Sequence, residues 1–577
     1  MSNDGAANHA PASSAARARV GIANRLTSRT IWRTTLALVL LQAGLVCVSE
    51  GAPEALFVTA VMLTFGSLVV VASGSLLLAA TLASVSVAIV HVAAYIKQQQ
   101  TEVLLHAYDV VSFFSSASAL TRFWRDHRQY AVATLAVMSL TAIAAGLAYR
   151  MDSLRVRRAH PAIAAALFAV MTCIAVGVKG EPRHTEFYFE NVYISFFLRS
   201  WADTIAALWR GQPLQAAATH DTANLLTPTI CEPASRPPNI VLIHQESVVP
   251  PEYFPQLSYD RSLDRFFRSY DGQLRKLHVE TYGGGSWLTE FSVFTGLSTY
   301  AFGSMRQVVQ QVMAGKIHDT LPQVLARCGY RNVVFYPMLR HFLGTGRFFE
   351  GVGLPKVFDA KDQGATLPNE RDRFYYANLI TEMQRHFKSS RQPLFAYLET
   401  MATHGAYTDT YMPEVDVPGG GRGTDPEMHE YLRRLAMAQI DYAAFRSELV
   451  RRFPGQSFLI VHYGDHQPTA TWTLHGFGNG TTIEKVMQGG NAAPLTTYYA
   501  VDAIGYRPPS LPALDVLDVP YLGTMVLDAA RLPLSDAFRA RKRLMLLCNG
   551  RYSSCPAEDE VLIFHRRLLS SGVVDAR

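Results

Sequence analysis

The sequence predicts two structural units, a multi-helix transmembrane unit in the N-terminal part and an α/β domain in the C-terminal part. Two observations support this prediction. Residues 55–96 contain no Asp, Glu, Lys or Arg, whereas apolar runs after residue 238 alternate with helical patterns, as in an α/β sheet. The chain has 577 residues, which is too long for a single hydrophobic core.

Five transmembrane spans are predicted. The uncharged stretch 55–96 has room for two spans, since each needs about 20 residues. Three further apolar runs meet the same criterion, namely residues 31–49, 129–149 and 161–178. Residues 1–30 are rich in Ala, Ser and Arg and lack the layout of a cleavable signal, so the first span is expected to be a retained anchor.

Basic residues set the expected orientation of the spans. Arginines precede or open the first span and separate the fourth span from the fifth, which predicts that both segments are cytoplasmic. Five spans then place the C-terminal domain outside. Residues 97–128 disagree, because they carry basic residues on the outer side; their apolar pattern would also fit an interfacial helix. The basic residues of this segment are Lys97, Arg122, Arg125 and Arg128.

The domain boundaries follow from these patterns. They are residues 1–30 as a cytoplasmic tail, 31–180 as a transmembrane domain with about five helices, 181–238 as a juxtamembrane segment and linker, and 239–577 as the C-terminal α/β domain. The juxtamembrane segment is crowded with aromatic residues, which favour the membrane–water boundary. A helix in this segment would lie at the membrane surface or pack on the domain's own surface, and the sequence favours neither.

Charge and cysteine content narrow the partners and the compartment. The net charge is +6, but juxtamembrane arginines account for most of the excess, so nucleic acid is not an expected partner. Cys47 and Cys173 fall in predicted spans. The other four cysteines would lie outside, where disulfides persist, and the close pair Cys548 and Cys555 is expected to be bonded. The remaining two are Cys231 and Cys328.

Four apolar runs in the C-terminal part are predicted to be buried strands of a mainly parallel sheet. They are residues 239–243, 332–336, 394–398 and 457–462. A helical pattern over residues 428–452 would cover one face of the sheet. The Gly-rich stretch 418–423 lacks the Lys-Ser/Thr of a phosphate-binding P-loop, so it is expected to be a surface loop.

Polar residues follow two of these strands. Glu246 comes after the first strand, and Asp465 and His466 come after the last one. Because parallel strands gather their ligand groups at their carboxyl ends, we expect these side chains to meet. An ion pair would explain Glu246 alone, whereas two strand ends with the same ligand chemistry favour one divalent cation. Mixed oxygen and imidazole ligands suit zinc or manganese.

Ser286 and His404 complete the expected catalytic group. Three glycines precede Ser286 and a helical stretch over residues 287–296, which places its hydroxyl at a helix N-terminus where anions are favoured. A serine there is an ordinary helix cap in most proteins, but a bound cation would make it a nucleophile. Thr289 ranks second, since one turn further along the helix it is expected to point elsewhere. His404 could protonate a leaving alkoxide.

Five further residues are weaker candidates for substrate binding. His462 and His475 flank the Asp-His pair, and hydrogen-bonded residues of the fold would explain them equally well. A basic group follows the second strand and could bind a phosphate or head group, although a solvated loop is the simpler interpretation. This group consists of Arg340, His341 and Arg347.

The pattern resembles the alkaline phosphatase/sulfatase superfamily, and in particular its membrane-anchored phosphotransferases: lipoteichoic acid synthases, phosphoglycerol transferases of periplasmic glucans and phosphoethanolamine transferases. The resemblance implies a sulfatase-like fold for residues 239–577 and a metal set of Glu246, Ser286, Asp465 and His466. The stretch from Ser286 to Phe291 is similar to the nucleophile segment of lipoteichoic acid synthases. His404 lies in a Thr-His-Gly segment that resembles the one supplying the family's active-site histidine.

Two departures from the family pattern leave the head group open. The nucleophile is Ser286 rather than the commoner threonine, and residues 336–349 lack the His and Trp-x-Arg head-group residues of lipoteichoic acid synthases. The Tyr-Gly-Asp-His motif slightly favours phosphoglycerol over phosphoethanolamine. A sulfatase proper would need Cys-x-Pro-x-Arg; the stretch 231–236 has one residue too many and precedes the first strand.

The resemblance implies a bacterial inner-membrane enzyme whose catalytic domain is extracytoplasmic. It would transfer a phosphoglycerol or phosphoethanolamine group from a phospholipid, through Ser286, to an envelope glycan or lipid acceptor. Two other functions remain open. With water as acceptor the protein would be a phosphodiesterase or sulfatase-type ester hydrolase, and without catalysis the domain would be a binding module for an envelope polymer.

Overall fold

The computed structural model describes residues 26–101, 103–115, 124, 128–154, 156–178, 192–210, 213–218, 225–227, 231–232, 237–417, 425–477 and 492–575. The chain divides into two units, one made of Met1–Pro182 and Phe189–Thr204 and the other of Arg183–Tyr188 and Ile205–Arg577. Most of the predicted tail, residues 1–30, lies outside the described residues.

The first unit is built from long apolar helices. They are α2 (Ser28–Ser49), α3 (Ala52–Ser73), α4 (Leu76–Thr101), α7 (Arg128–Met151) and α8 (Ala159–Val178). Within the described ranges, four are long and apolar enough to cross a membrane, namely α2, α3, α4 and α7, whereas Ala159–Ile174 is a shorter apolar helix. All five predicted spans fall on helices, and the role of α8 as a fifth span stays a prediction.

Two shorter helices among the described residues lie wholly or partly in this unit. Helix α5 (Ala107–Ser115) lies in the ambiguous segment 97–128, where Lys97 forms an ion pair with Asp109. Helix α10 (Tyr193–Arg210) begins against the carboxylate of Glu50, which accepts hydrogen bonds from the Ile194 amide and the Ser195 hydroxyl, both at 2.6 Å. The start of α10 therefore packs on helices of its own unit, and its placement at a membrane surface stays a prediction.

The second unit is an α/β domain around one mixed sheet. The strands are β1 (Asn239–Gln245), β2 (Arg275–His278), β3 (Arg331–Phe335), β4 (Lys356–Phe358), β5 (Leu394–Glu399), β6 (Phe458–Gly464), β7 (Thr496–Ile504) and β8 (Leu517–Asp518). Their order is β4-β3-β5-β1-β6-β7-β2-β8. Strands β4, β3, β5, β1 and β6 are parallel, and β7 pairs antiparallel with β6. The predicted mainly parallel sheet is confirmed, with its four predicted strands at β1, β3, β5 and β6.

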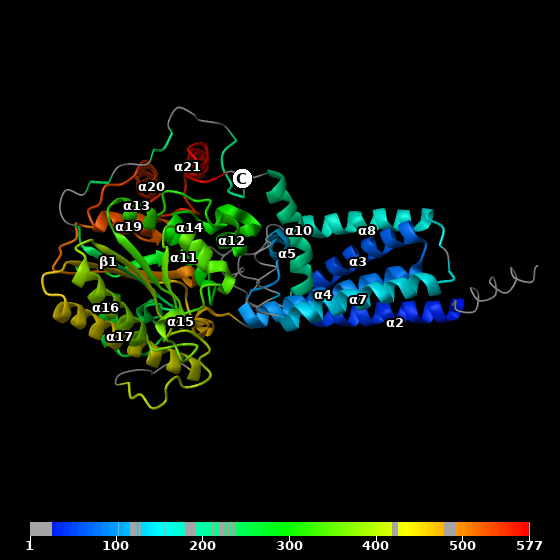
Figure 1. Ribbon diagram of the computed structural model, residues 1–577, viewed down its shortest axis with the longest axis horizontal. Coiled ribbons are helices and arrows are strands. Elements are labelled where there is room, and N and C mark those ends of the chain that lie inside the picture. Colours follow the sequence, from blue (N-terminus) through cyan, green and yellow to red (C-terminus); the bar gives the residue numbers. More distant parts are fainter. Residues whose placement is uncertain are drawn as a thin grey trace, which may run out of the picture. The chain divides into compact units, whose positions relative to one another are not determined.

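Helices cover both faces of this sheet (Figure 1). One layer contains α16 (Asp372–Ser389) and α17 (Pro426–Arg452), and the other contains α11 (Ser286–Thr295), α13 (Leu321–Arg327) and α19 (Leu522–Ala529). Strands β1 and β6 are buried along their whole length, as expected for the centre of a two-sided α/β sheet. Further α-helices in the described part of this unit are α12 (Val309–Met313), α14 (Thr345–Gly351), α15 (Ala360–Gln363), α20 (Asp536–Leu547) and α21 (Glu558–Ser570).

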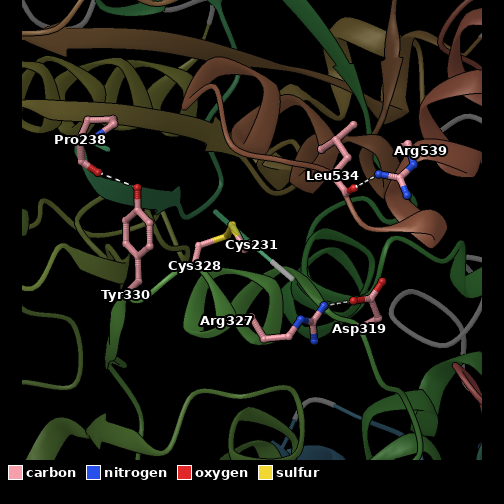
Figure 2. The surroundings of a disulfide bond; sticks show 8 residues. All are labelled: Cys231, Pro238, Asp319, Arg327, Cys328, Tyr330, Leu534 and Arg539. Carbon is pink, nitrogen blue, oxygen red and sulfur yellow. Dashed lines mark hydrogen bonds and ion pairs between the residues drawn. A yellow bond between two sulfur atoms is a disulfide. The ribbon is translucent and has the colours of Figure 1, made fainter. Parts of the chain in front are cut away.

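Two disulfides connect parts of the α/β unit. The expected pair, Cys548 and Cys555, is bonded. The sequence did not indicate the second bond, which joins Cys231 and Cys328 across 97 residues. Figure 2 shows this bond beside the hydrogen bond that the Tyr330 hydroxyl donates to the Pro238 carbonyl at 2.7 Å. The segment that enters β1 is therefore fastened to the turn between α13 and β3.

Candidate metal centre

The ends of β1 and β6 bring the predicted ligands together. In the sheet, Gln245 pairs with Gly464, so Glu246 and Asp465 each leave the sheet one residue later and side by side. Gly464 is required for this approach, because a Cβ at its position would lie 1.9 Å from the Val248 carbonyl oxygen. Ser247 adopts a positive φ of 57°, a conformation that costs a non-glycine residue free energy and that turns the chain at this point.

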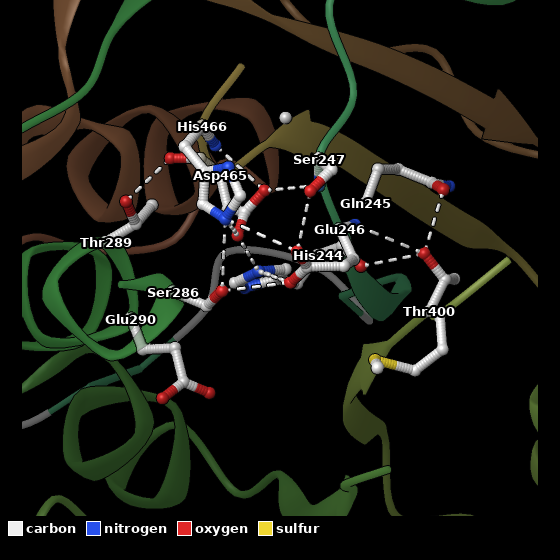
Figure 3. Close-up of polar contacts among 12 residues, drawn as sticks. His244, Gln245, Glu246, Ser247, Ser286, Thr289, Glu290, Thr400, Asp465 and His466 are labelled. Carbon is white, nitrogen blue, oxygen red and sulfur yellow. Dashed lines mark hydrogen bonds and ion pairs between the residues drawn. The ribbon is translucent and has the colours of Figure 1, made fainter. Parts of the chain in front are cut away.

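Glu246, Asp465, His466 and Ser286 meet in one cluster (Figure 3). The Ser286 hydroxyl donates to Glu246 Oε2 at 2.9 Å and lies 3.5 Å from His466 Nε2. His466 Nε2 is in turn 3.3 Å from Glu246 Oε1 and 3.2 Å from Asp465 Oδ2. Carboxylate, hydroxyl and imidazole ligand atoms therefore converge on one point.

The buried polar atoms of this cluster fit a divalent cation. Asp465 Oδ2 is buried and has no aligned hydrogen-bond donor, although His244 Nε2 and His466 Nε2 lie only 3.0 and 3.2 Å away. Buried carboxylate oxygens of this kind are costly unless a cation compensates them. Glu246, Asp465 and His466, with Ser286 and His244 beside them, would hold the ion. This mixture of carboxylate and imidazole suits zinc or manganese.

The electrostatics of the cluster also favour a cation. Burial alone would lower the pKa of His466, but the carboxylates of Asp465 and Glu246 raise it to about 9. The pKa of Glu246 lies well below its usual value, because the attraction of His466 outweighs the effect of burial. Without a metal, the imidazole proton supplies the positive charge that the carboxylates demand. Metal binding would displace that proton, so the affinity for metal should rise with pH.

Ser286 is the first residue of helix α11. The preceding Gly285 has a φ of 86°, which favours glycine and lets the chain turn sharply into the helix. The Ser286 side chain is only partly buried, so a substrate can reach it. Its place at a helix N-terminus favours the negative charge of an alkoxide or a phosphoryl oxygen.

His404 lies in the loop after β5, and this loop forms hydrogen bonds with the backbone at the end of β1. The Thr403 hydroxyl donates to the Glu246 carbonyl at 2.5 Å, and the Glu246 amide donates to Thr400. His404 is partly exposed, and its Nδ1 lies 2.7 Å from the Gly405 carbonyl oxygen. Because a carbonyl only accepts, Nδ1 holds a proton and Nε2 remains as the nitrogen for proton exchange.

The alternative hydroxyl and two other histidines have structural partners. Thr289 is fully buried and donates to the Asp465 carbonyl at 2.8 Å. His462 packs in the core, with Nδ1 2.9 Å from the Tyr498 hydroxyl, and burial lowers its pKa to about 4. His475 Nε2 donates to the Gln467 side-chain oxygen at 2.6 Å. Gln467 follows His466, so His475 touches the neighbour of the cluster rather than the cluster itself.

The basic group after β3 consists of Arg340, His341 and Arg347, and the contacts described for it do not include the metal cluster. Arg340 forms ion pairs with Asp359 and Asp362, which already use its guanidinium. His341 and Arg347 are exposed. A phosphate or head-group pocket at these three residues stays a prediction.

The sequence reasoning missed His244, which is fully buried inside β1. Its Nε2 lies 3.0 Å from Asp465 Oδ2 and 4.0 Å from Glu246 Oε2. Its Nδ1 lies 2.7 Å from the Tyr397 hydroxyl, which donates to Glu290 at 3.2 Å. The sequence did contain a signal for His244, because it and Gln245 are polar residues at the end of an otherwise apolar, buried strand.

The fold and this cluster place the second unit in one class of proteins: α/β domains with a candidate metal site at the carboxyl ends of their parallel strands. Residues 238–489 match the sulfatase family model. The α/β unit is therefore similar to the sulfatase family over these residues. No curated protein sequence matches the chain.

Several solved structures are similar to this chain at low identity. The phosphoglycerol transferase of Streptococcus pyogenes is 15% identical, over 59% of this chain and 87% of that chain, with a TM-score of 0.46. A lipoteichoic acid synthase of Listeria monocytogenes is 16% identical, over 51% and 72%, with a TM-score of 0.39. The lipooligosaccharide phosphoethanolamine transferase A of Neisseria meningitidis is 11% identical, over 86% and 96%, with a TM-score of 0.40.

Proposed function

We propose that this protein is a metal-dependent phosphotransferase of the bacterial inner membrane. It moves a phosphoglycerol or phosphoethanolamine group from a phospholipid to an envelope glycan or lipid acceptor, and the Tyr-Gly-Asp-His motif favours phosphoglycerol slightly. One observation supports this proposal above the others: the partly exposed Ser286 hydroxyl donates to Glu246 at 2.9 Å at the start of a helix, among the candidate metal ligands.

The reaction has two displacements at phosphorus. Ser286 Oγ attacks the phosphodiester and loses its proton, the bond to the diacylglycerol oxygen breaks, and diacylglycerol leaves with a proton. An acceptor hydroxyl then attacks the phosphodiester on Ser286, and the serine oxygen regains a proton. Energy comes from the phosphodiester that the donor already contains, so no nucleotide is needed.

Residues of the chain share the work of these steps. The bound cation would lower the pKa of the Ser286 hydroxyl and stabilise charge on the phosphoryl oxygens. The N-terminus of α11 orients those oxygens. His404, with Nδ1 held by the Gly405 carbonyl, gives a proton to the leaving oxygen through Nε2 in the first step and accepts one from the acceptor in the second.

Two observations support an extracytoplasmic α/β unit in a membrane protein. Four helices of the other unit are long and apolar enough to span a membrane. Both disulfides belong to the α/β unit, and disulfides persist mainly in oxidising compartments. The bond at Cys231 also argues against a sulfatase-type hydrolase, because a bonded cysteine cannot be the precursor of formylglycine.

The test is to trap the serine intermediate. The full-length protein in detergent micelles is loaded with a divalent metal and incubated with phosphatidylglycerol or phosphatidylethanolamine, and the peptide containing Ser286 is analysed by mass spectrometry. We expect an adduct whose mass identifies the head group, and diacylglycerol in equal amount.

Three variants serve as controls for this experiment. Ser286→Ala should abolish the adduct and Asp465→Asn should abolish it together with metal binding, whereas Thr289→Ser, which keeps the hydrogen bond to the Asp465 carbonyl, should retain both. Absence of an adduct from both lipids, in protein shown to contain metal, would reject the transferase. Hydrolysis of either lipid with no transfer to any hydroxyl acceptor would instead favour a phosphodiesterase.

A further inference from the structure

A second polar cleft lies at the same edge of the sheet as the metal cluster. It has a volume of about 1070 Å³, which is large enough for a ligand of several rings. His278 ends β2 and pairs with Thr496 at the start of β7 and with Asp518 at the end of β8, and all three line the cleft. The cleft therefore lies over the β7-β2-β8 side of the sheet, beyond β6.

Gln467 connects this cleft to the metal cluster. It lines the cleft and directly follows His466, so the two Cα atoms are about 3.8 Å apart. Its carbonyl accepts from the Gly283 amide at 3.0 Å, in the glycine turn that leads to Ser286. Its side-chain amide donates to the carbonyls of Ala493 and Thr496, both at 2.7 Å. A ligand in the cleft would therefore lie against the backbone that holds the nucleophile.

The carboxylates of the cleft are already engaged. Glu252 forms an ion pair with Arg268. Asp518 contacts His278 at 3.0 Å and accepts from the Tyr552 and Ser553 amides. Asp515 accepts from the Asn549 side chain at 3.3 Å. None of the three forms an ion pair with the two long basic side chains of the cleft.

The basic side chains, in contrast, are free to take a ligand. Lys276 and Arg551 line the cleft and are exposed. Within the described ranges neither one forms an ion pair with a carboxylate, and the only charge-related contact of Lys276 is with the Tyr253 ring at 5.9 Å. Arg551 also lies outside the residues that match the sulfatase family, 238–489. The cleft thus offers two basic side chains without an ion pair among the described residues, and one of them, Arg551, lies outside the family match.

We propose that this cleft binds the acceptor, and that the acceptor is a polyhydroxyl compound carrying a phosphate or carboxylate group, which Lys276 and Arg551 bind. This inference rests on the proposed transferase function, which requires an acceptor hydroxyl at the Ser286 phosphodiester. That hydroxyl oxygen forms the new bond to phosphorus as the bond to Ser286 Oγ breaks; its proton passes to His404, and Ser286 Oγ regains the proton that it lost in the first step. The anionic group stays in the cleft and orients the hydroxyl.

The test measures binding apart from catalysis. The full-length protein in detergent is titrated with glucose 6-phosphate, glucuronate and glucose by isothermal calorimetry, which separates a phosphate ligand from a carboxylate ligand and both from a neutral sugar. We expect one anionic sugar to bind at least about tenfold more tightly than glucose, since charge-assisted hydrogen bonds supply the difference.

Variants then locate the binding site. The double variant Lys276→Gln/Arg551→Gln should lose the preference for the anionic sugar, and Lys276→Arg/Arg551→Lys should retain much of it. Lys388→Gln/Arg391→Gln removes the same charges from exposed positions that do not line the cleft, and should bind like the wild type. Equal binding of all three sugars by the wild type, or an unchanged preference in the first double variant, would overturn the inference.

The serine adduct distinguishes this failure from failure of the proposed function. If Ser286 forms the adduct from phospholipid but no charge preference exists, the transferase stands and the cleft is not its anionic acceptor site. If the preference exists but no adduct forms, the assignment of the bound sugar as an acceptor falls together with the transferase.

Discussion

At the residue scale, Asp465 organises the candidate metal centre. Its Oδ1 accepts from the amides of Ser247 and His466, both at 2.8 Å, which fixes the carboxylate and leaves Oδ2 facing the other ligand atoms. His244 then lies beside Oδ2, with its ring held on the far side by the Tyr397 and Tyr463 hydroxyls at 2.7 and 3.2 Å. Such supporting contacts orient ligand atoms before the metal binds.

Replacement of His244 tests this support. His244→Gln keeps a polar atom near the position of Nε2, whereas His244→Asn keeps one near Nδ1 only. We expect metal affinity to fall about 10- to 100-fold in His244→Asn. The loss should be smaller in His244→Gln, because Nε2 is the ring nitrogen that faces Asp465. Metal titration of both purified variants checks this, with the thermal unfolding midpoint as a control for folding. Equal losses in the two variants would mean that His244 acts only through packing.

At the element scale, two strand ends and one helix start define the site. Strands β1 and β6 are neighbours in register, and α11 begins with Ser286. The approach of the two strand ends depends on the absence of a side chain at Gly464. The glycine of the Tyr-Gly-Asp-His motif is therefore a steric requirement.

Gly464→Ala should separate the strand ends without a local backbone penalty. The new Cβ would lie 1.9 Å from the Val248 oxygen, so the turn carrying Glu246 must shift away from Asp465. We expect metal affinity and serine adduct yield to fall at least about tenfold, while destabilisation stays at about 1–3 kcal/mol. Gly364→Ala is the control. Gly364 has a φ of 75° and open space around it, so this variant should be less stable but should keep its metal affinity and its adduct yield.

The start of α16 holds the loop that carries His404. Asp372 is fully buried, and its Oδ1 accepts from the Met401 and Ala402 amides at 3.1 and 2.9 Å. Burial, reinforced by the nearby Asp441, raises the pKa of Asp372 to about 7. A carboxyl with a raised pKa is protonated more readily in the folded state than in the unfolded chain.

This shift predicts how stability depends on pH. The contribution of Asp372 is fully present below its unfolded pKa of about 3.9 and is lost as pH rises through about 7. Asp372→Asn keeps an acceptor oxygen for both amides and removes the titration. The variant should exceed the wild type in stability at pH 8 by an amount on the order of 2–4 kcal/mol, and the gap should close near pH 4. Parallel thermal-unfolding midpoints across this range would contradict the prediction.

At the scale of the whole molecule, covalent links tie distant parts of the α/β unit together. The Cys231–Cys328 bond spans 97 residues, whereas Cys548–Cys555 spans 7. A cross-link that closes a longer loop removes more conformational entropy from the unfolded chain. The first bond should therefore contribute more to stability than the second.

Paired cysteine replacements test this difference. Cys231→Ala/Cys328→Ala should lower the free energy of unfolding of the α/β unit by about 4–5 kcal/mol, and Cys548→Ala/Cys555→Ala by about 2–3 kcal/mol, from loop entropy alone. Denaturant titration of the purified proteins, followed by tryptophan fluorescence, measures both values. A larger loss from the short loop would show that packing around Cys548, rather than loop length, dominates.

Sequence patterns predicted the elements well because their signals are local. Apolar runs marked β1, β3, β5 and β6, and a stretch without charges marked α3 and α4. The Cys231–Cys328 bond escaped prediction because nothing near either cysteine in the sequence points to the other. The ion pairs of Arg340 with Asp359 and Asp362 could not be seen in the sequence either, because both partners lie about 20 residues further along the chain; a phosphate pocket at Arg340 stays a prediction.

The sequence by itself determined that apolar helices precede a mainly parallel α/β domain, and that Glu246, Ser286, Asp465 and His466 follow strand ends or open a helix. Periodicity and turn chemistry act over a few residues, so they can be seen without a fold. Only the tertiary structure decided that these side chains meet, that His244 joins them from inside β1, and that Lys276 and Arg551 share one cleft. Those facts depend on which strands pair and in what register, a result of packing between residues that lie far apart in the chain.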